Sequence, residues 1–207
     1  IAAGSEVKIL PSAETVGLTS LTFSPDSNYV YYIAQNTLFQ LSVLGGTPKK
    51  LSQNISGSSQ HNEISFSPDG NQFAFIRHST GEEEIASVII ANTDGTDERV
   101  LATSKRPDIF LGSAAWSPDG KVIAIRTSTE KGNKIVTARV KDGVVSPISS
   151  SHWSIVSQIV WQPGGNSLLV IATEGRSSIS HQIWSLSYPG GEAKNITNDL
   201  NNYLSIS

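Results

Sequence analysis

The chain of 207 residues carries 15 basic and 18 acidic side chains, a formal net charge of −3, and 38% hydrophobic against 16% charged residues. This balance argues against disorder and a coiled coil, and without a lysine or arginine cluster it disfavours nucleic acid or an anionic membrane as partner. The lack of cysteine excludes zinc fingers, iron–sulfur clusters and thiol nucleophiles, and no apolar run approaches the roughly 20 residues that cross a bilayer.

A five-residue motif recurs four times along the chain. It reads Phe-Ser-Pro-Asp-Ser at 23–27, Phe-Ser-Pro-Asp-Gly at 66–70, Trp-Ser-Pro-Asp-Gly at 116–120, and in weaker form Trp-Gln-Pro-Gly-Gly at 161–165. The aromatic positions are 43, 50 and 45 residues apart, close to the roughly 40–50 residues of one propeller blade. The four copies therefore predict four structural repeats.

Each motif is followed by segments of strand type. Short apolar runs rich in β-branched or aromatic residues cover 29–33, 72–76, 122–125 and 168–172. A further strand is predicted at 38–43, 87–91, 135–140 and 183–187, and a short closing strand near Leu51, Val100, Ile148 and Ile196. Because four strands per repeat are typical of a propeller blade, we predict an all-β protein, a β-propeller of four-stranded antiparallel blades.

The Ser-Pro-Asp-Gly motif has the chemistry of a tight turn. Proline fixes φ near −65°, aspartate bonds the backbone two residues on, and glycine accepts angles that a β-carbon would forbid. We therefore assign Asp69 and Asp119 to turns rather than to a metal or catalytic site, and expect the preceding aromatic residue to lie between neighbouring blades. The fourth copy has Gln162 and Gly164 instead of serine and aspartate, which predicts a looser turn.

These hairpins, with the apolar strand and glycine turn that follow each, resemble TolB-like β-propeller repeats, which are WD40-like, over roughly Leu18 to Ser207. The stretches 44–51, 184–193 and 196–201 resemble propellers appended to bacterial signalling proteins. In that group the propeller follows a Ser/Thr kinase domain or the winged-helix domain of a transcriptional regulator. Neither companion domain is present in these 207 residues.

We expect a single propeller domain or fragment over 1–207. The repeats are expected at approximately 18–57, 61–104, 111–150 and 156–200, with 1–11 as the end of a preceding blade and 202–207 as the start of a following one. An open arc would expose apolar faces and unpaired edges. Since the resemblance implies six or more blades and the chain lacks methionine, we expect a processed protein or an excised part of a larger ring. Alternatively, two chains complete each other, or the terminal pieces combine into one extra blade.

No motif for catalysis or metal binding is found. The four histidines, His61, His78, His152 and His181, have no helical metal-site spacing, and neither a Gly-x-Ser-x-Gly elbow nor a phosphate-binding glycine signature occurs. The Asp-Gly-Thr-Asp run at 94–97 lacks the alternating ligands of a calcium loop and is read as a turn. We therefore predict no catalytic residue, no metal and no cofactor for this chain.

Loops at one mouth of the propeller are the place to look for binding. Those that lead into the blades contain Gln60-His61, the segment 105–108, His152-Trp153 and the segment 199–201. Arg106, His152 and Trp153 are the candidate binding residues in these loops, because an exposed tryptophan beside a histidine suits a ligand or peptide contact. The alternative is structural: Trp153 packs under its own loop and Arg106 pairs with Asp108.

The sequence therefore predicts a non-catalytic sensor or protein-interaction module of a larger bacterial signalling protein, with a protein or peptide as partner. Two alternatives stay open: an accessory propeller that gates a prolyl-oligopeptidase-type peptidase, and a free-standing periplasmic docking protein. The resemblance implies a periplasmic or extracellular location. We expect no nucleic-acid contact and no membrane insertion, and self-association if the ring is incomplete.

Overall fold

The computed structural model describes residues 17–53, 55, 64–79, 81–148, 152–175, 180–199 and 201–206. Within these ranges every element is a strand, and the strands form four-stranded antiparallel sheets in which sequential strands are neighbours. The predicted all-β class and the four-stranded antiparallel blades are confirmed. No helix in the described ranges is long and apolar enough to cross a membrane.

Each sheet corresponds to one copy of the repeat, and its first strand ends at the aromatic residue of the motif. The first contains β1 (Leu18–Phe23), β2 (Tyr29–Ala34), β3 (Thr37–Ser42) and β4 (Lys49–Gln53). The second contains β5 (Ser65–Phe66), β6 (Gln72–His78), β7 (Ile85–Asn92) and β8 (Arg99–Lys105). The third contains β9 (Ile109–Trp116), β10 (Val122–Thr129), β11 (Gly132–Arg139) and β12 (Val145–Pro147), and the fourth β13 (Ile155–Trp161), β14 (Ser167–Thr173), β15 (Gln182–Ser187) and β16 (Ala193–Asn195).

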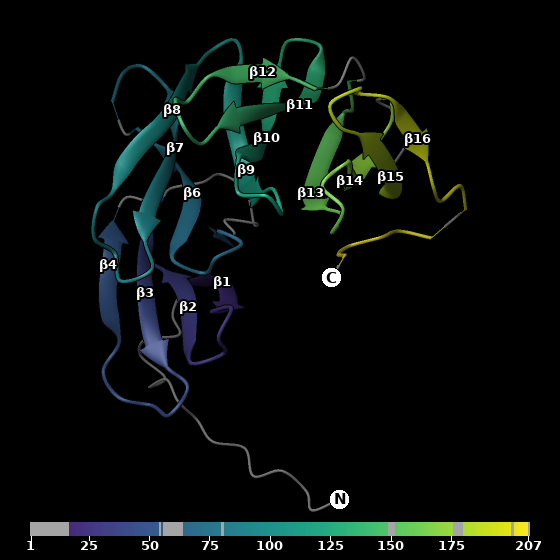
Figure 1. The fold of residues 1–207 in the computed structure, drawn as a ribbon. Helices are drawn as coiled ribbons and strands as arrows, with labels where there is room; N and C mark the ends of the chain where they lie inside the picture. The colour runs from purple at the N-terminus through teal and green to yellow at the C-terminus, as the bar shows by residue number, and fades with distance from the viewer. Residues whose placement is uncertain are drawn as a thin grey trace, which may run out of the picture.

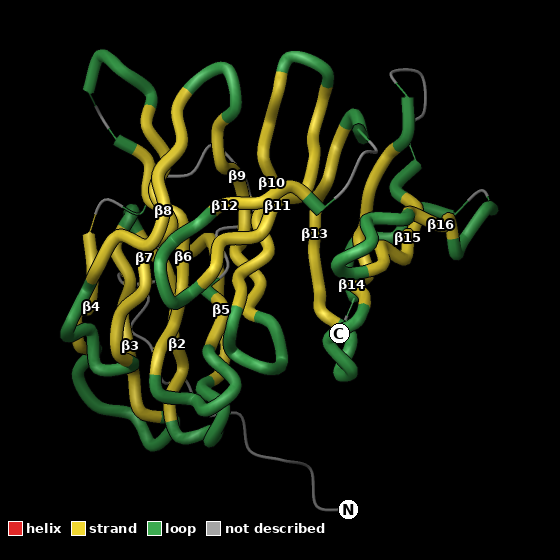
Figure 2. The backbone as a smooth tube through the Cα atoms, turned by 45° about the horizontal axis from the view of Figure 1, so that its top comes forward, coloured by secondary structure: helices red, strands yellow, loops and turns green. Residues whose placement is uncertain are grey.

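The sheets stand side by side around an arc (Figures 1 and 2). The first strands β1, β9 and β13 lie on the concave inner side, and the last strands β4, β8, β12 and β16 lie on the outer side (Figure 1). This is the radial arrangement of propeller blades, in which the first strand of each blade faces the axis.

A separate apolar layer fills each junction between successive sheets. Tyr31 and Leu38 meet Phe73 and Phe75 between the first and second sheets. The other two layers join the second sheet to the third and the third to the fourth, and include Val88, Trp116 and Ile123 in one and Ala124, Trp161 and Val170 in the other. Because side chains alternate along a strand, each middle sheet buries both of its faces.

The aromatic residue of each motif lies on the same face of its sheet. Trp116 and Trp161 are buried in the layers on the N-terminal side of their sheets, and the Phe66 ring meets Tyr31 edge-on at 4.9 Å. The same position in the first sheet is Phe23, which is 56% exposed. The prediction of a burial between blades is therefore wrong for Phe23, because its face of the sheet points away from the second sheet.

The serine and aspartate of the motif close each turn through side-chain hydrogen bonds. Ser117 Oγ donates to Asp119 Oδ1 at 2.7 Å and accepts from the Val122 amide at 3.1 Å. Asp119 also accepts from the Lys121 amide at 3.1 Å. The first and second turns repeat this pattern at 24–29 and 67–72. Asp69 and Asp119 thus have the turn role that the sequence predicts.

The fourth turn keeps the backbone geometry without the aspartate. The Gly165 amide donates to Gln162 O at 2.9 Å, as the Gly120 amide does to Ser117 O at 2.9 Å. Gln162 accepts a side-chain bond from Ser167 Oγ, which replaces the serine–aspartate pair. The prediction of a looser turn is wrong, because the hydrogen-bonding partner has moved to the other end of the hairpin.

Successive turns also touch one another. A β-carbon on Gly70 would lie 3.6 Å from the Pro25 ring, one on Gly120 would lie 3.8 Å from Pro68, and one on Gly165 would lie 3.9 Å from Pro118. The proline of one turn therefore packs over the glycine of the next. These glycines have φ near +70°, which a side chain would strain.

The terminal segments are only partly described. Residues 1–11 lie outside the described ranges, so the preceding blade stays a prediction. Residues 201–206 form no strand but return over the fourth sheet, where the Tyr203 amide donates to His181 O at 3.0 Å. The Ile206 amide then donates to Gln158 Oε1 at 2.7 Å on the inner strand β13.

The turn network predicts a stability loss when its serine is removed. Ser117→Ala leaves the amide of the half-buried Val122 without its acceptor, so urea unfolding should show a loss of about 1–2 kcal/mol. The matched control is Ser146→Ala on the outer strand β12, an exposed serine whose change should stay within about 0.5 kcal/mol. Equal effects of the two substitutions would contradict the role given to the turn.

The same network predicts a pH dependence. Hydrogen bonds, first from the motif serine and then from the residue two positions on, lower the pKa of Asp26, Asp69 and Asp119. Their contribution to stability is full above the unfolded pKa and is lost as pH falls through the lower folded pKa. Unfolding free energy should therefore fall below about pH 4, and the triple change to Asn should flatten that fall. Glu130→Gln, on an exposed turn, is the control that should leave the slope unchanged.

Candidate functional site

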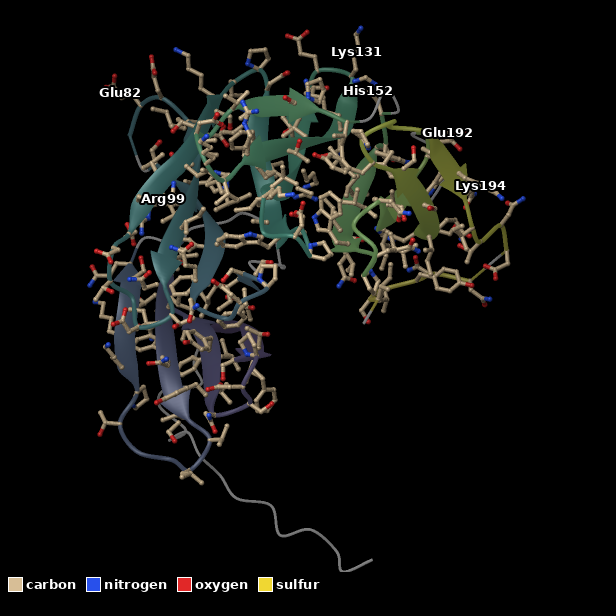
Figure 3. All side chains as sticks on the ribbon, in the orientation of Figure 1. Glu82, Arg99, Lys131, His152, Glu192 and Lys194 are labelled. Carbon is tan, nitrogen blue, oxygen red and sulfur yellow. The ribbon has the colours of Figure 1, made fainter. Side chains whose placement is uncertain are left out.

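A charged rim lies at one end of the second, third and fourth sheets. Figure 3 shows Glu82 on the left of the upper edge, and Lys131 and His152 on its right. They belong to the loops that join β6 to β7, β10 to β11 and β12 to β13. We call the loop residues 81–84, 105–108, 129–132 and 152–154 the rim. It holds both signs of charge on connections between rigid strands, an arrangement that suits recognition.

The start of β11 holds two of these loops at the same end. Lys134 Nζ lies 2.6 Å from Asp108 Oδ2 in the loop between β8 and β9. The Asn133 amide donates to Trp153 O at 2.6 Å, and the Trp153 amide donates to Asn133 O at 2.9 Å. Because adjacent residues of one strand bind both loops, the rim is tied to the third sheet on both sides.

Arg106 forms an ion pair across the rim. Its Nε lies 2.8 Å from Glu84 Oε2, and both side chains are largely exposed. The expected pairing of Arg106 with Asp108 is wrong, because Asp108 binds Lys134 and the neighbouring β6–β7 loop supplies Glu84 instead. An exposed pair of this kind contributes little to stability, so Arg106 can exchange its partner at little cost.

Trp153 is buried, with 2% of its surface exposed. Its ring meets Trp184 edge-on with the centroids 6.2 Å apart, in the layer between the third and fourth sheets. The expectation of an exposed tryptophan is wrong, and the alternative in which Trp153 packs beneath its own loop is confirmed. Gly132 permits this approach, since a β-carbon there would lie 2.7 Å from Trp153 O.

His152 remains exposed beside that anchor. It lies near Lys131 on the upper edge of the molecule (Figure 3). Of the three candidate residues, Arg106 and His152 thus lie on the surface, whereas Trp153 is buried beneath the loop that carries His152. The roles of Arg106 and His152 in binding stay predictions.

The other predicted loop residues are placed only in part. Gln60, His61 and Leu200 lie outside the described ranges. Asp199 accepts from Tyr203 Oη at 2.9 Å and from Asn201, and the bond from Tyr203 is the main cause that lowers the pKa of Asp199. This pair orders the segment that returns over the fourth sheet. Over the described ranges, no group of three or more His, Asp or Glu residues could hold a metal ion.

Comparison with known proteins places this fold among TolB structures. The Tol-Pal system protein TolB of Wigglesworthia glossinidia brevipalpis is 32% identical over 79 residues, which are 38% of this chain and 18% of that protein. No protein-family model matches the chain. The chain thus spans less than a fifth of the curated relative that it matches.

Solved structures agree over most of the chain. A protein described as TolB from Agrobacterium tumefaciens superposes with a TM-score of 0.69 at 20% identity, over 89% of this chain and 63% of that one. TolB from Acinetobacter baumannii gives 0.67 at 15% identity, over 87% and 43%. A puromycin hydrolase gives 0.63 at 16% identity, over 88% of this chain and 31% of that one. The fold is a TolB-like β-propeller fold, which these neighbours share across different functions.

The structure of the rim predicts a large loss of stability at Trp153 and almost none at the adjacent His152. Trp153→Ala removes a buried aromatic side chain and should lower the unfolding free energy by about 3–5 kcal/mol. His152→Ala should change it by no more than about 0.5 kcal/mol, because the side chain is exposed. Chemical denaturation of both variants measures the difference, and a small loss for Trp153→Ala would contradict its role as an anchor.

Proposed function

We propose that this chain is a non-catalytic protein-interaction or sensor module that recognises a protein or peptide through the rim. The observation that carries the proposal is the pairing of an exposed charged rim with a buried anchor, in a TolB-like propeller fold. The buried Trp153 and the start of β11 hold the rim loops in place through backbone hydrogen bonds, while the side chains of Arg106 and His152 stay exposed. Loops held in this way lose little entropy when they bind.

The parent protein is proposed to be a bacterial signalling protein. The stretches 44–51 and 184–193, which resemble propellers appended to kinases and winged-helix regulators, support this proposal. In the structure both stretches include the turn between the third and fourth strands of a blade. A periplasmic or extracellular location is part of the same proposal and is supported by the likeness to TolB.

An accessory role in a hydrolase is the second candidate. This chain covers 31% of the puromycin hydrolase that shares its fold, so about two thirds of that hydrolase lies outside the matched part. An accessory propeller would gate access to a catalytic domain carried elsewhere in the parent. Peptide sequencing of the intact parent protein separates the candidates: a kinase or winged-helix domain supports signalling, and a Gly-x-Ser-x-Gly segment supports the hydrolase. A signal peptide without either domain would support a free-standing docking protein.

The rim predicts which substitutions weaken binding. A photoreactive benzoylphenylalanine at position 106 or 152 of the intact parent should cross-link to a specific protein in the source cells. With that protein purified, calorimetry should show about tenfold weaker binding for Arg106→Ala with His152→Ala. Lys194→Ala, an exposed lysine on the outer strand β16 away from the rim (Figure 3), should leave affinity unchanged. Binding that responds to Lys194 and not to the rim would overturn the proposal.

A further inference from the structure

Arg126 lies between the inner strands of two neighbouring sheets. It belongs to β10, and its Nη1 donates to the carbonyl of Val156 on β13. Its guanidinium also lies against Gly112 on β9, since a β-carbon there would be 3.3 Å from Nη2 and 3.4 Å from Cζ. Both β9 and β13 face the concave side of the arc (Figure 1), so the guanidinium belongs to the inner wall between the third and fourth sheets.

No acidic side chain in the described part of the chain pairs with this cation. Arg77, Arg106 and Arg139 each bind a carboxylate within 2.8 Å. For Arg126 the carbonyl of Val156 is the one hydrogen-bond partner among the described residues, and its Nε is buried without any. Burial alone lowers the pKa of Arg126, with no nearby charge among its causes. A guanidinium withdrawn from water without a counter-charge is costly, so an anion that binds beside Arg126 would offset part of that cost.

The backbone around Arg126 is shaped to hold it. The pairing of β9 with β10 shifts register between Ile125 and Arg126, which marks a bulge in the inner strand. Gly112 lies in that bulge with φ of 72°, where a side chain would both strain the backbone and crowd the guanidinium. Bulges of this kind occur beside binding sites, where they redirect a side chain. The glycine leaves room for a planar group along the strand.

We propose that Arg126 is an anion site on the inner wall, and that it binds the carboxylate of a small acid or of an acidic peptide segment. The side chain is partly exposed, and Nη2 forms no hydrogen bond with the described residues, so this edge of the guanidinium is left for a ligand. The planar edge of a guanidinium presents two parallel N–H donors that match a carboxylate.

The site is independent of the rim, so it can be tested without a partner protein. In the 207-residue chain labelled with ¹⁵N-arginine, the Arg126 Nε resonance is identified by its loss in Arg126→Lys. Sodium acetate is titrated against sodium chloride at constant ionic strength, with inorganic phosphate and the peptide acetyl-Gly-Asp-Gly-amide as parallel series. We expect a saturable shift of the Arg126 signal, with an apparent Kd of roughly 1–10 mM for acetate.

Two variants and one internal control make the result decisive. Arg99 also donates to a carbonyl of the next sheet, Val140 O at 3.3 Å, but is exposed, so its signal should shift only linearly. Gly112→Ala keeps the charge but crowds the guanidinium, and should weaken acetate binding at least fivefold while circular dichroism confirms the fold. A stronger response to the peptide than to acetate assigns the carboxylate to a protein segment, and the reverse assigns it to a small acid. A linear or absent shift at Arg126, the same shift in chloride, or a response to phosphate alone overturns the proposal and leaves Arg126 as a strut between sheets.

Discussion

The need of each sheet to bury both faces against its neighbours is the constraint on which this structure depends. A four-stranded sheet with apolar residues on both faces cannot be stable alone, and stacking sheets around an axis satisfies both faces at once. The layer that contains Phe73 and the layer that contains Trp161 are formed by different pairs of sheets, yet they use equivalent positions of the repeat. Because these layers fix how neighbouring sheets pack, they also fix where the loops at the ends of each sheet lie.

The turn motif links these layers at their edge. Within one hairpin, Ser67 and Asp69 satisfy the amides that the turn leaves unpaired. Between hairpins, the Pro68 ring packs over Gly120. The motif thus combines a local hydrogen-bonding role with a contact between blades, which explains why proline and glycine recur at the same spacing as the aromatic residue. The fourth turn shows that the hydrogen-bonding part can be exchanged for Gln162 and Ser167 while the contact with Pro118 is kept.

Sequence reasoning identifies the repeated strands and turns of this fold but misses side-chain contacts that are not part of the repeat. Period, strand type and turn chemistry predict the sheets because they depend on local residues that recur. The partners of single side chains depend instead on which loops meet in space, so sequence reasoning left Trp153 open between an exposed and a buried position and named the wrong partner for Arg106. The predicted burial of Phe23 fails for a related reason. It requires another sheet packed against the first sheet on the face away from the second, and the described residues do not supply one. Arg126 carries no sequence signal beyond a cation within an apolar strand. That no carboxylate of the described residues pairs with it emerges only from the packed sheets.

The two proposed sites use the same rigid sheets in different ways. At the rim, Arg106 is exposed and already paired, so an exchange of Glu84 for the carboxylate of a partner would cost little. At the inner wall, Arg126 is partly withdrawn from water and meets no carboxylate of the described residues, so a ligand carboxylate would form a charge-assisted hydrogen bond there. Because Asn133 and Lys134 of β11 fix the rim loops and β10 of the same sheet carries Arg126, the third sheet sets the distance between the two contacts.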